Sequence, residues 1–327
     1  MTDALVTVQS LSRDFDVSRP WLNRVLSRES KKTLTAVDSV DFTIERGTTY
    51  ALVGESGSGK STIAKMLVGL LEPSSGRVHI DGVDLFTASA GDITRTRQRI
   101  QMIFQDPYAS LNPRWRVRDI IGEPIDAFMN ATSTERTRKV DELLEKVGLS
   151  TKDAVKFPHE FSGGQRQRIG IARALASDPE FIVCDEPTSA LDVSVQAQVL
   201  NLMRDLQRDL GLTYLFITHD LAVVQYMADQ VGVLYLGRLI ESAPRKMLFD
   251  TPAHPYTQML IDAAPKVDGF GRKHEAIDGE IPDPISPPSG CHFHPRCKIM
   301  KDECSQQVPV VMHDDDNRSV SCLLHKS

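Results

Sequence analysis

Residues 54–61, Gly-Glu-Ser-Gly-Ser-Gly-Lys-Ser, have the spacing G-x-x-x-x-G-K-S and predict a loop that binds phosphate. Its glycines let consecutive backbone N–H groups face an anion, and Lys60 adds a positive charge toward the β- and γ-phosphates. The Ser61 hydroxyl is placed to bind Mg²⁺. A flexible turn without a ligand is the alternative. The predicted nucleotide-binding residues of this loop are Gly54, Glu55, Ser56, Gly57, Ser58, Gly59, Lys60, Ser61 and Thr62.

The elements that must hold this loop are visible on both sides of it. Residues 50–53 form a short apolar run that suits a buried strand. Ile63, Met66, Leu67 and Leu70 follow at the spacing of one face of a helix. The glycines therefore lie between a strand and a helix, which is the context in which this motif binds nucleotides.

A second apolar run, residues 181–184, ends in the two acids Asp185 and Glu186. A carboxylate at the end of a buried strand can hold Mg²⁺, directly or through water. A second carboxylate beside it can polarise a water molecule for attack on a γ-phosphate. The pair is therefore a candidate for metal-assisted phosphate chemistry.

Composition limits the class of protein. The chain has 327 residues, with 41% hydrophobic and 25% charged residues, as is ordinary for a globular protein. Its formal net charge of −6 argues against nucleic-acid binding as the main role. We expect no membrane span and no secretory signal, and the basic cluster Arg95, Arg97 and Arg99 is expected to be a solvated helix face.

The rest of the chain suggests an α/β core with additions. Strands are expected over residues 5–15, 34–53 and 214–218, and a hairpin over 231–241. Residues 105–175 are predicted to be helical, with a capping box at Thr132–Glu135. Residues 16–33 look like an insertion that forms a surface amphipathic helix, with contact to a membrane-side partner as the alternative. From Pro252 the chain is rich in proline, and Pro282, Pro284, Pro287 and Pro288 mark a stretch that is expected to lack regular structure.

Taken together, these motifs resemble the ATP-binding-cassette (ABC) family over residues 5–250. The resemblance implies a P-loop NTPase fold with an antiparallel β subdomain and a helical subdomain at about 105–175. Asp185 then matches the Mg²⁺-binding acid and Glu186 the general base. Gln105 matches the glutamine that joins Mg²⁺ to the transporter interface, and His219 matches the histidine that contacts the γ-phosphate.

The resemblance also supplies a second nucleotide-binding segment. In the family, the segment at 162–165 completes the ATP site of a neighbouring subunit, so that ATP joins two cassettes. Residues 189–192 match the loop that crosses that dimer. Phe15 is the candidate for stacking on adenine, although it could equally be a core residue. The residues of the second segment are Ser162, Gly163, Gly164 and Gln165.

Four of the five cysteines lie in the last part of the chain, at positions 291, 297, 304 and 322, and only Cys184 lies in a buried strand. Free thiols, disulfides and a metal site are the alternatives, and a reducing compartment disfavours disulfides. Four thiolates on an irregular segment suit Zn²⁺ or an iron–sulfur cluster. The histidines at 292 and 294 are expected to be structural neighbours. The predicted ligands are Cys291, Cys297, Cys304 and Cys322.

Residues 287–297 and 254–258 resemble the C-terminal extension of oligopeptide/dipeptide ABC importers, as does the segment 104–113. That resemblance divides the chain into an ATPase domain, 1–250, and an extension, 251–327. It favours a [4Fe–4S] cluster over Zn²⁺ on the cysteines, because some members of that branch carry one.

The implied function is ATP hydrolysis that drives peptide import, with ATP and Mg²⁺ as cofactors. The implied partners are two transmembrane permease subunits, an extracytoplasmic solute-binding protein and a paralogous ATPase, in a heterodimer rather than a homodimer. The implied place is the cytoplasmic face of the plasma (inner) membrane, without nucleic acid. The alternatives are import of nickel or oligosaccharide by the same type of motor, a soluble non-transport ABC ATPase, and a nucleotide sensor without turnover.

Overall fold

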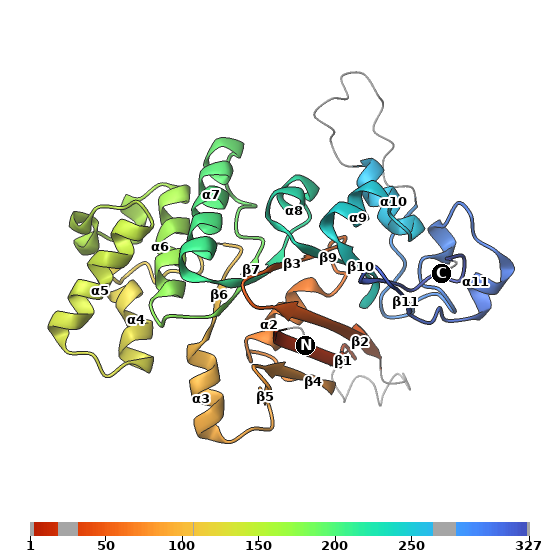
Figure 1. The fold of residues 1–327 in the computed structure, drawn as a ribbon, viewed down its shortest axis with the longest axis horizontal. Coiled ribbons are helices and arrows are strands. Elements are labelled where there is room, and N and C mark those ends of the chain that lie inside the picture. The colour runs from red at the N-terminus through yellow and green to blue at the C-terminus, as the bar shows by residue number, and fades with distance from the viewer. Residues whose placement is uncertain (1–2, 19–31, 107, 264–278, 326–327) are drawn as a thin grey trace.

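The core of the molecule is a mixed sheet that runs across the middle of Figure 1. The computed structural model describes residues 3–18, 32–106, 108–263 and 279–325. Five neighbouring strands of the sheet are parallel, which leaves their carboxyl ends along one edge. In spatial order they are β6 (Ile100–Ile103), β7 (Phe181–Asp185), β8 (Thr213–Ile217), β3 (Thr49–Val53) and β9 (Gln230–Tyr235).

Side chains of the central strands alternate between two buried cores, because successive strand residues point to opposite faces. Ile182 and Phe216 pack with the helical part of the chain. Val183 and Leu215 pack with the phosphate-loop helix and the second sheet. Both faces are covered, which explains why these strands are continuous apolar runs rather than alternating ones.

An antiparallel sheet packs against one of these faces, below the central sheet in Figure 1. Its strand order is β2-β1-β4-β5, and every neighbouring pair is antiparallel. The strand predicted at 5–15 and the first part of the strands predicted over 34–53 are confirmed here. The strands are β1 (Ala4–Asp16), β2 (Thr33–Glu45), β4 (Ser75–Ile80) and β5 (Val83–Asp84).

The helices between residues 117 and 210 lie on the other face and extend away from it at the left of Figure 1, whereas the phosphate-loop helix packs on the same face as the antiparallel sheet. The predicted capping box at Thr132 and Glu135 is present, and Val140, Leu143 and Leu144 are buried as expected. The helices are α2 (Lys60–Leu67), α3 (Ala90–Gln98), α4 (Val117–Phe128), α5 (Ser133–Lys146), α6 (Gly163–Leu175), α7 (Val193–Leu210) and α8 (Leu221–Met227), with short 3-10 turns η1 (Thr151–Val155) and η2 (Pro158–Glu160).

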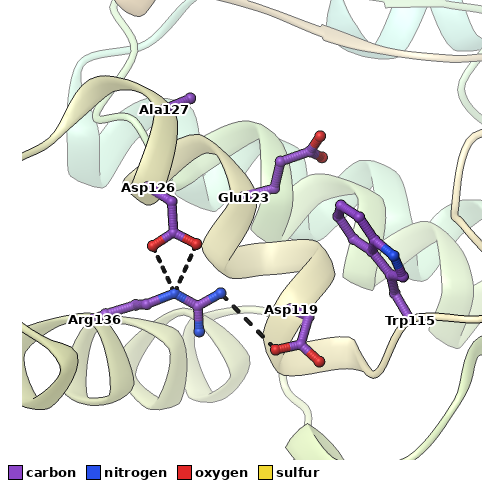
Figure 2. Close-up of a pocket in the computed structure, with 6 residues that line it drawn as sticks. All are labelled: Trp115, Asp119, Glu123, Asp126, Ala127 and Arg136. Carbon is purple, nitrogen blue, oxygen red and sulfur yellow. Dashed lines mark hydrogen bonds and ion pairs between the residues drawn. The ribbon is translucent and has the colours of Figure 1, made fainter.

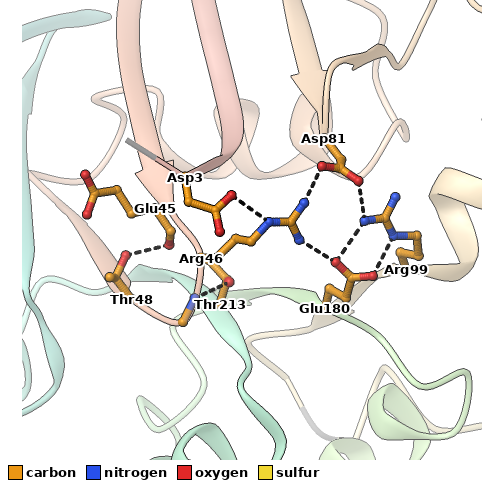
Figure 3. Close-up of polar contacts among 9 residues, drawn as sticks. Asp3, Glu45, Arg46, Thr48, Asp81, Arg99, Glu180 and Thr213 are labelled. Carbon is orange, nitrogen blue, oxygen red and sulfur yellow. Dashed lines mark hydrogen bonds and ion pairs between the residues drawn. The ribbon is translucent and has the colours of Figure 1, made fainter. Parts of the chain in front are cut away.

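An ionic network joins the antiparallel sheet to the central sheet (Figure 3). Arg99, at the end of α3, lies 2.8 Å from both Asp81 and Glu180. Arg46 pairs with the same two acids and with Asp3. The expectation that Arg99 belongs to a solvated helix face is therefore wrong: its side chain leaves the helix and bridges two subdomains.

The C-terminal part continues the central sheet. The predicted hairpin is confirmed as β9 and β10 (Arg238–Pro244). The predicted irregular stretch at residues 282–288 is confirmed too, and two later strands extend the central sheet beyond β10. The added elements are α9 (Arg245–Asp250), α10 (Pro255–Ala263), η3 (His294–Arg296), α11 (Asp302–Gln306), β11 (Met312–Asp314) and β12 (Arg318–Val320).

Among the described helices, none has the length and hydropathy needed to cross a membrane. The predicted amphipathic helix of the 16–33 insertion falls mostly on residues 19–31, which lie outside the described residues. At its base, the Val17 N–H donates to the Lys32 carbonyl at 3.1 Å, so the insertion leaves and re-enters the antiparallel sheet at one place.

Candidate functional site

The phosphate loop connects β3 to α2, as the sequence predicts. Gly54 and Gly59 have φ of 152° and 105°, which side-chain-bearing residues rarely adopt. A Cβ at Gly54 would overlap the carbonyl oxygen of Leu234, and one at Gly59 would overlap that of Ala36. The backbone of neighbouring strands therefore packs closely against the loop, and only glycine fits at these two positions.

Lys60 is folded back onto the loop that precedes it. Its Nζ donates to the carbonyl oxygens of Gly54 and Glu55 at 2.7 and 2.8 Å. Burial lowers the pKa of Lys60, and the nearby carboxylates of Glu186 and Asp185 act in the opposite direction. The ammonium group thus lies over the loop, beside two acids, where an incoming anion would be attracted.

Ser61 and Asp185 bring two oxygen ligands together at the end of β7. The Ser61 hydroxyl donates to the Asp185 carboxylate at 3.1 Å. Burial raises the pKa of Asp185, although the Ser61 hydrogen bond lowers it. A hydroxyl and a partly buried carboxylate are the hard oxygen ligands that Mg²⁺ prefers, so these residues fit the predicted metal.

Glu186 lies between two predicted catalytic side chains. Its carboxylate accepts from Gln105 Nε2 at 2.8 Å and lies 3.0 Å from His219 Nδ1. These three residues follow β6, β7 and β8, so the parallel register of adjacent strands brings them together. Glu186 itself has a φ of 47°, a left-handed backbone conformation that costs free energy and is often found at functional sites.

The predicted second segment begins helix α6. The Ser162 hydroxyl accepts from the Gln165 backbone N–H, and the Gln165 side chain accepts from the Ser162 N–H. A Cβ at Gly164 would overlap Val195 on α7, so this glycine permits close packing of two helices. In the described part of the chain, no hydrogen bond links residues 162–165 to the loop at 54–62.

Phe15 lies at the end of β1 and is half-buried, outside the three hydrophobic clusters. The guanidinium of Arg13 lies 4.8 Å from the centre of its ring. The ring is therefore accessible for stacking, and the alternative assignment as a core residue does not describe its environment.

The sequence did not indicate a contact between the phosphate loop and the C-terminal part. Arg296, in η3, donates to both carboxylate oxygens of Glu55 at 2.7 and 2.9 Å. The Tyr256 hydroxyl, from α10, accepts from the Glu55 backbone N–H at 3.1 Å. The motif permits any residue at position 55, and its partner lies 241 residues away, so only the folded chain reveals the contact.

The four C-terminal cysteines line one cavity of about 10 Å³, together with His254 and His294. Burial raises the pKa of Cys291 and of Cys297. The predicted metal site is not borne out as such: no group of three or more His, Cys, Asp or Glu side chains in the described residues is arranged to hold an ion. The free space is about that of one water molecule.

A separate groove of about 580 Å³ lies between α4 and α5 (Figure 2). Asp126 accepts from Arg136 at 2.8 Å, while Glu123 and Asp119 also line the groove. Trp115, 41% exposed, stands at its edge. None of the predicted nucleotide residues lines it, so this groove is distinct from the phosphate loop.

The fold and this loop define a P-loop nucleotide-binding protein of the ABC type. A family model described as "ABC transporter" matches residues 37–189. A second, described as "Oligopeptide/dipeptide transporter, C-terminal region", matches residues 240–304.

Relatives agree over nearly the full chain. A "Probable peptide ABC transporter ATP-binding protein" of Sinorhizobium fredii is 47% identical over 98% of this chain and 90% of its own length. The "Oligopeptide transport ATP-binding protein AppF" of Bacillus subtilis is 48% identical over 89% of each chain. The chain therefore belongs to the family of peptide ABC transporter ATP-binding proteins.

Solved structures extend the likeness to the fold. An ATP-binding cassette in a dimeric post-hydrolysis state with ADP and Pi matches with a TM-score of 0.64 at 26% identity, over 73% of this chain and 98% of that one. The cbiO1 protein of Clostridium perfringens, part of an ABC transporter complex, also matches with a TM-score of 0.64, at 29% identity over 76% and 92% of the chains.

Proposed function

We propose that this chain hydrolyses ATP to ADP and phosphate as the motor subunit of a peptide importer. The observation that carries the proposal is the Glu186 carboxylate held between Gln105 and His219, next to Ser61 and Asp185. Membership in the family of peptide ABC transporter ATP-binding proteins supplies the substrate class.

Binding of ATP would draw Lys60 away from the loop. Its Nζ now binds the carbonyls of Gly54 and Glu55, and phosphate oxygens are stronger, charged acceptors for an ammonium group. Ser61, Asp185 and Gln105 would hold Mg²⁺, which neutralises charge on the phosphates when bound. Phe15 would stack on adenine.

Glu186 would act as the general base. Its carboxylate can accept a proton from an attacking water molecule, and the His219 and Gln105 contacts fix its orientation. His219 is exposed on its other side, with 65% of its side chain accessible, and is therefore available to the γ-phosphate.

A second cassette would complete the site. The N-terminus of α6, with Ser162 and its two glycines, is a site where N–H groups and the helix dipole favour an anion. Because residues 162–165 make no hydrogen bond to the loop of the same chain, they are available to the phosphate held by another copy or by a related ATPase. We propose a related ATPase as the preferred partner.

The remaining partners would be two permease subunits in the membrane and an extracytoplasmic solute-binding protein. The chain would then act at the cytoplasmic face of the membrane. The names of the curated relatives support peptides over nickel or oligosaccharide as the transported solute. We assign the ATPase domain to residues 1–250 and the extension to 251–327.

We also propose a metal on the four C-terminal cysteines, a [4Fe–4S] cluster before Zn²⁺. They share one cavity, and His254 Nε2 in its wall is buried without a hydrogen-bond partner. His254 Nδ1 accepts from the Tyr256 N–H, so Nε2 carries a proton that a thiolate sulfur could accept. The cavity must widen for a cluster. Iron and zinc content and visible absorbance after anaerobic purification test this proposal. It is refuted if the purified protein contains neither iron nor zinc in stoichiometric amount.

The central test is Glu186→Gln. Without the general base, we expect turnover to fall by about 10²–10⁴-fold and an ATP-bound dimer to accumulate. ATPase rate and light scattering with Mg·ATP measure both effects. Glu142→Gln, on the exposed side of α5, is the control and should behave like the wild type. Unchanged turnover in Glu186→Gln would refute the assignment.

A further inference from the structure

The extension is connected to the phosphate loop through one loop residue, Glu55. Its peptide group is held on both sides: the N–H donates to Tyr256 at 3.1 Å, and the carbonyl accepts from Lys60 at 2.8 Å. Its carboxylate forms a two-pronged pair with Arg296. Two of these three anchors come from the C-terminal part of the chain.

The pair is sheltered from solvent. Only 2% of the Arg296 side chain and 15% of the Glu55 side chain are exposed. A planar guanidinium that makes two parallel bonds to one carboxylate fixes the angle as well as the distance of its partner. The Glu55 bonds raise the pKa of Arg296, so the guanidinium stays charged across the physiological range.

Arg296 is itself held by a rigid surround. Tyr235, Tyr256 and Phe293 form an aromatic cluster with ring centres 4.6 to 5.4 Å apart, and Arg296 also donates to the Tyr235 hydroxyl. The next residue, Cys297, lines the cysteine cavity. The position of Arg296 therefore depends on how the cysteine-bearing segment is folded.

We propose that Arg296 is a positioning residue for ATP binding, which couples the cysteine-bearing segment to the phosphate loop. It neutralises an acid that would otherwise face the phosphates, and it holds the loop in the conformation that receives them. This inference rests on the proposed nucleotide site, but it concerns affinity rather than hydrolysis.

The Arg296→Met variant leaves the Glu55 carboxylate beside the loop without its charged partner, with only the Tyr256 hydroxyl donating to it at 3.4 Å. We expect the Kd for a fluorescent ATP analogue with Mg²⁺ to rise between about fivefold and 150-fold, the usual range for coupling between two sites. We expect kcat at saturating ATP to stay within about twofold, because neither residue touches the reacting atoms. Arg318→Met is the matched control: it removes an arginine of the same extension that binds Thr251 instead, and its Kd should equal that of the wild type.

Two further variants separate positioning from folding. Adding Glu55→Gln to Arg296→Met removes the uncompensated charge, so the double variant should bind ATP more tightly than Arg296→Met alone. Arg296→Lys keeps the charge but not the two-pronged geometry and should fall between wild type and Arg296→Met. If Arg296→Met does not fold, Arg296→Lys and Tyr256→Phe replace it, and both should raise Kd.

The proposal is wrong if Arg296→Met binds like Arg318→Met, or if Glu55→Gln brings no relief in the double variant. Where Arg296→Met does not fold, equal Kd values for Arg296→Lys, Tyr256→Phe and the wild type would refute it too. Failure of the proposed ATPase would look different: the wild type would bind the analogue without hydrolysing ATP, and the binding comparison would still stand.

Discussion

At the scale of single residues, the site holds charges that favour ligand binding over stability. Asp185 is partly buried, and burial raises its pKa, which means that its ionised form is unfavourable in the folded protein without Mg²⁺. The charged form of Lys60 is also unfavourable, because burial lowers the pKa of this side chain. The charges of Mg·ATP would stabilise the ionised forms of both side chains.

The Asp185→Asn variant should therefore be more stable than the wild type and inactive. An acid whose pKa is raised by folding destabilises the folded protein at a pH where it is ionised, and this cost disappears as the pH falls through the raised pKa. At neutral pH, asparagine removes that cost because it carries no charge. Asparagine can still accept from Ser61. We expect the melting temperature of the nucleotide-free protein to rise by about 2 °C or more, with loss of Mg²⁺-dependent ATPase activity.

Thermal unfolding without nucleotide measures the first effect, and an ATPase assay measures the second. The stability gain should shrink when the pH is lowered toward the raised pKa of Asp185, since the wild-type carboxyl then becomes neutral too. A lower melting temperature at neutral pH would show that the charge is not a source of instability.

The residues proposed to react could be picked out from the sequence because their spacing is local. Glu186 follows a recognisable strand, and Lys60 closes a loop motif. The sequence did not predict that Glu186 contacts His219, since that depends on the order of strands in the sheet. It predicted the four cysteines as metal ligands, but their arrangement in the described chain is a closed cavity and not an ion-binding group. The Arg296 contact to Glu55 had no sequence signal.

At the scale of elements, the ionic network of Figure 3 joins the start of β7 to α3 and to one end of the antiparallel sheet. Hydrogen bonds from Arg99 lower the pKa of Asp81 and of Glu180. Acids with depressed pKa stabilise the fold above their ordinary pKa, and this contribution disappears as the pH falls through the depressed values.

The Arg99→Met variant should lose about 1 kcal/mol of unfolding free energy at pH 7, the upper end for partly exposed ion pairs. The difference from wild type should decrease below about pH 4, where the two acids become protonated. Urea unfolding at pH 7 and pH 3 measures this. Arg95→Met removes an exposed arginine from the same helix and serves as the control. A difference that does not change with pH would mean that packing, not charge, is responsible.

Longer elements were predicted better than short ones. The helix at 133–146 has an apolar face and a capping box, and both signals are local. Strands β11 and β12 have three residues each and no alternating pattern. Strand β12 pairs with β10 from more than 70 residues away, and β11 pairs with β12. Such strands form only because an existing sheet edge can receive them, which no local pattern can indicate.

At the scale of the whole molecule, the two segments proposed to form a nucleotide site are both present but are not joined. The loop at 54–62 and the N-terminus of α6 lie in one chain without a hydrogen bond between them. A solved relative in fold is itself a dimeric cassette with ADP and Pi. Because each copy carries both proposed segments, we expect two copies to pair when no related ATPase competes.

Mixing two inactive variants tests whether the site forms between chains. Lys60→Ala removes the phosphate loop's charge, and Ser162→Arg blocks the start of α6. In a mixed dimer, one site carries both defects and the other carries none. Random pairing makes half of the dimers mixed, so we expect about a quarter of wild-type ATPase activity to return on mixing.

Each variant alone should be inactive, and a mixture of Lys60→Ala with the double variant Lys60→Ala/Ser162→Arg should stay inactive, because no intact site can form. Light scattering with Mg·ATP, using Glu186→Gln as the reference dimer, confirms that the variants pair. If the variants pair and no activity returns, residues 54–62 and 162–165 do not share a nucleotide across the interface. Activity in Ser162→Arg alone would place the whole catalytic site within one chain, because its own phosphate loop and Glu186 would then suffice.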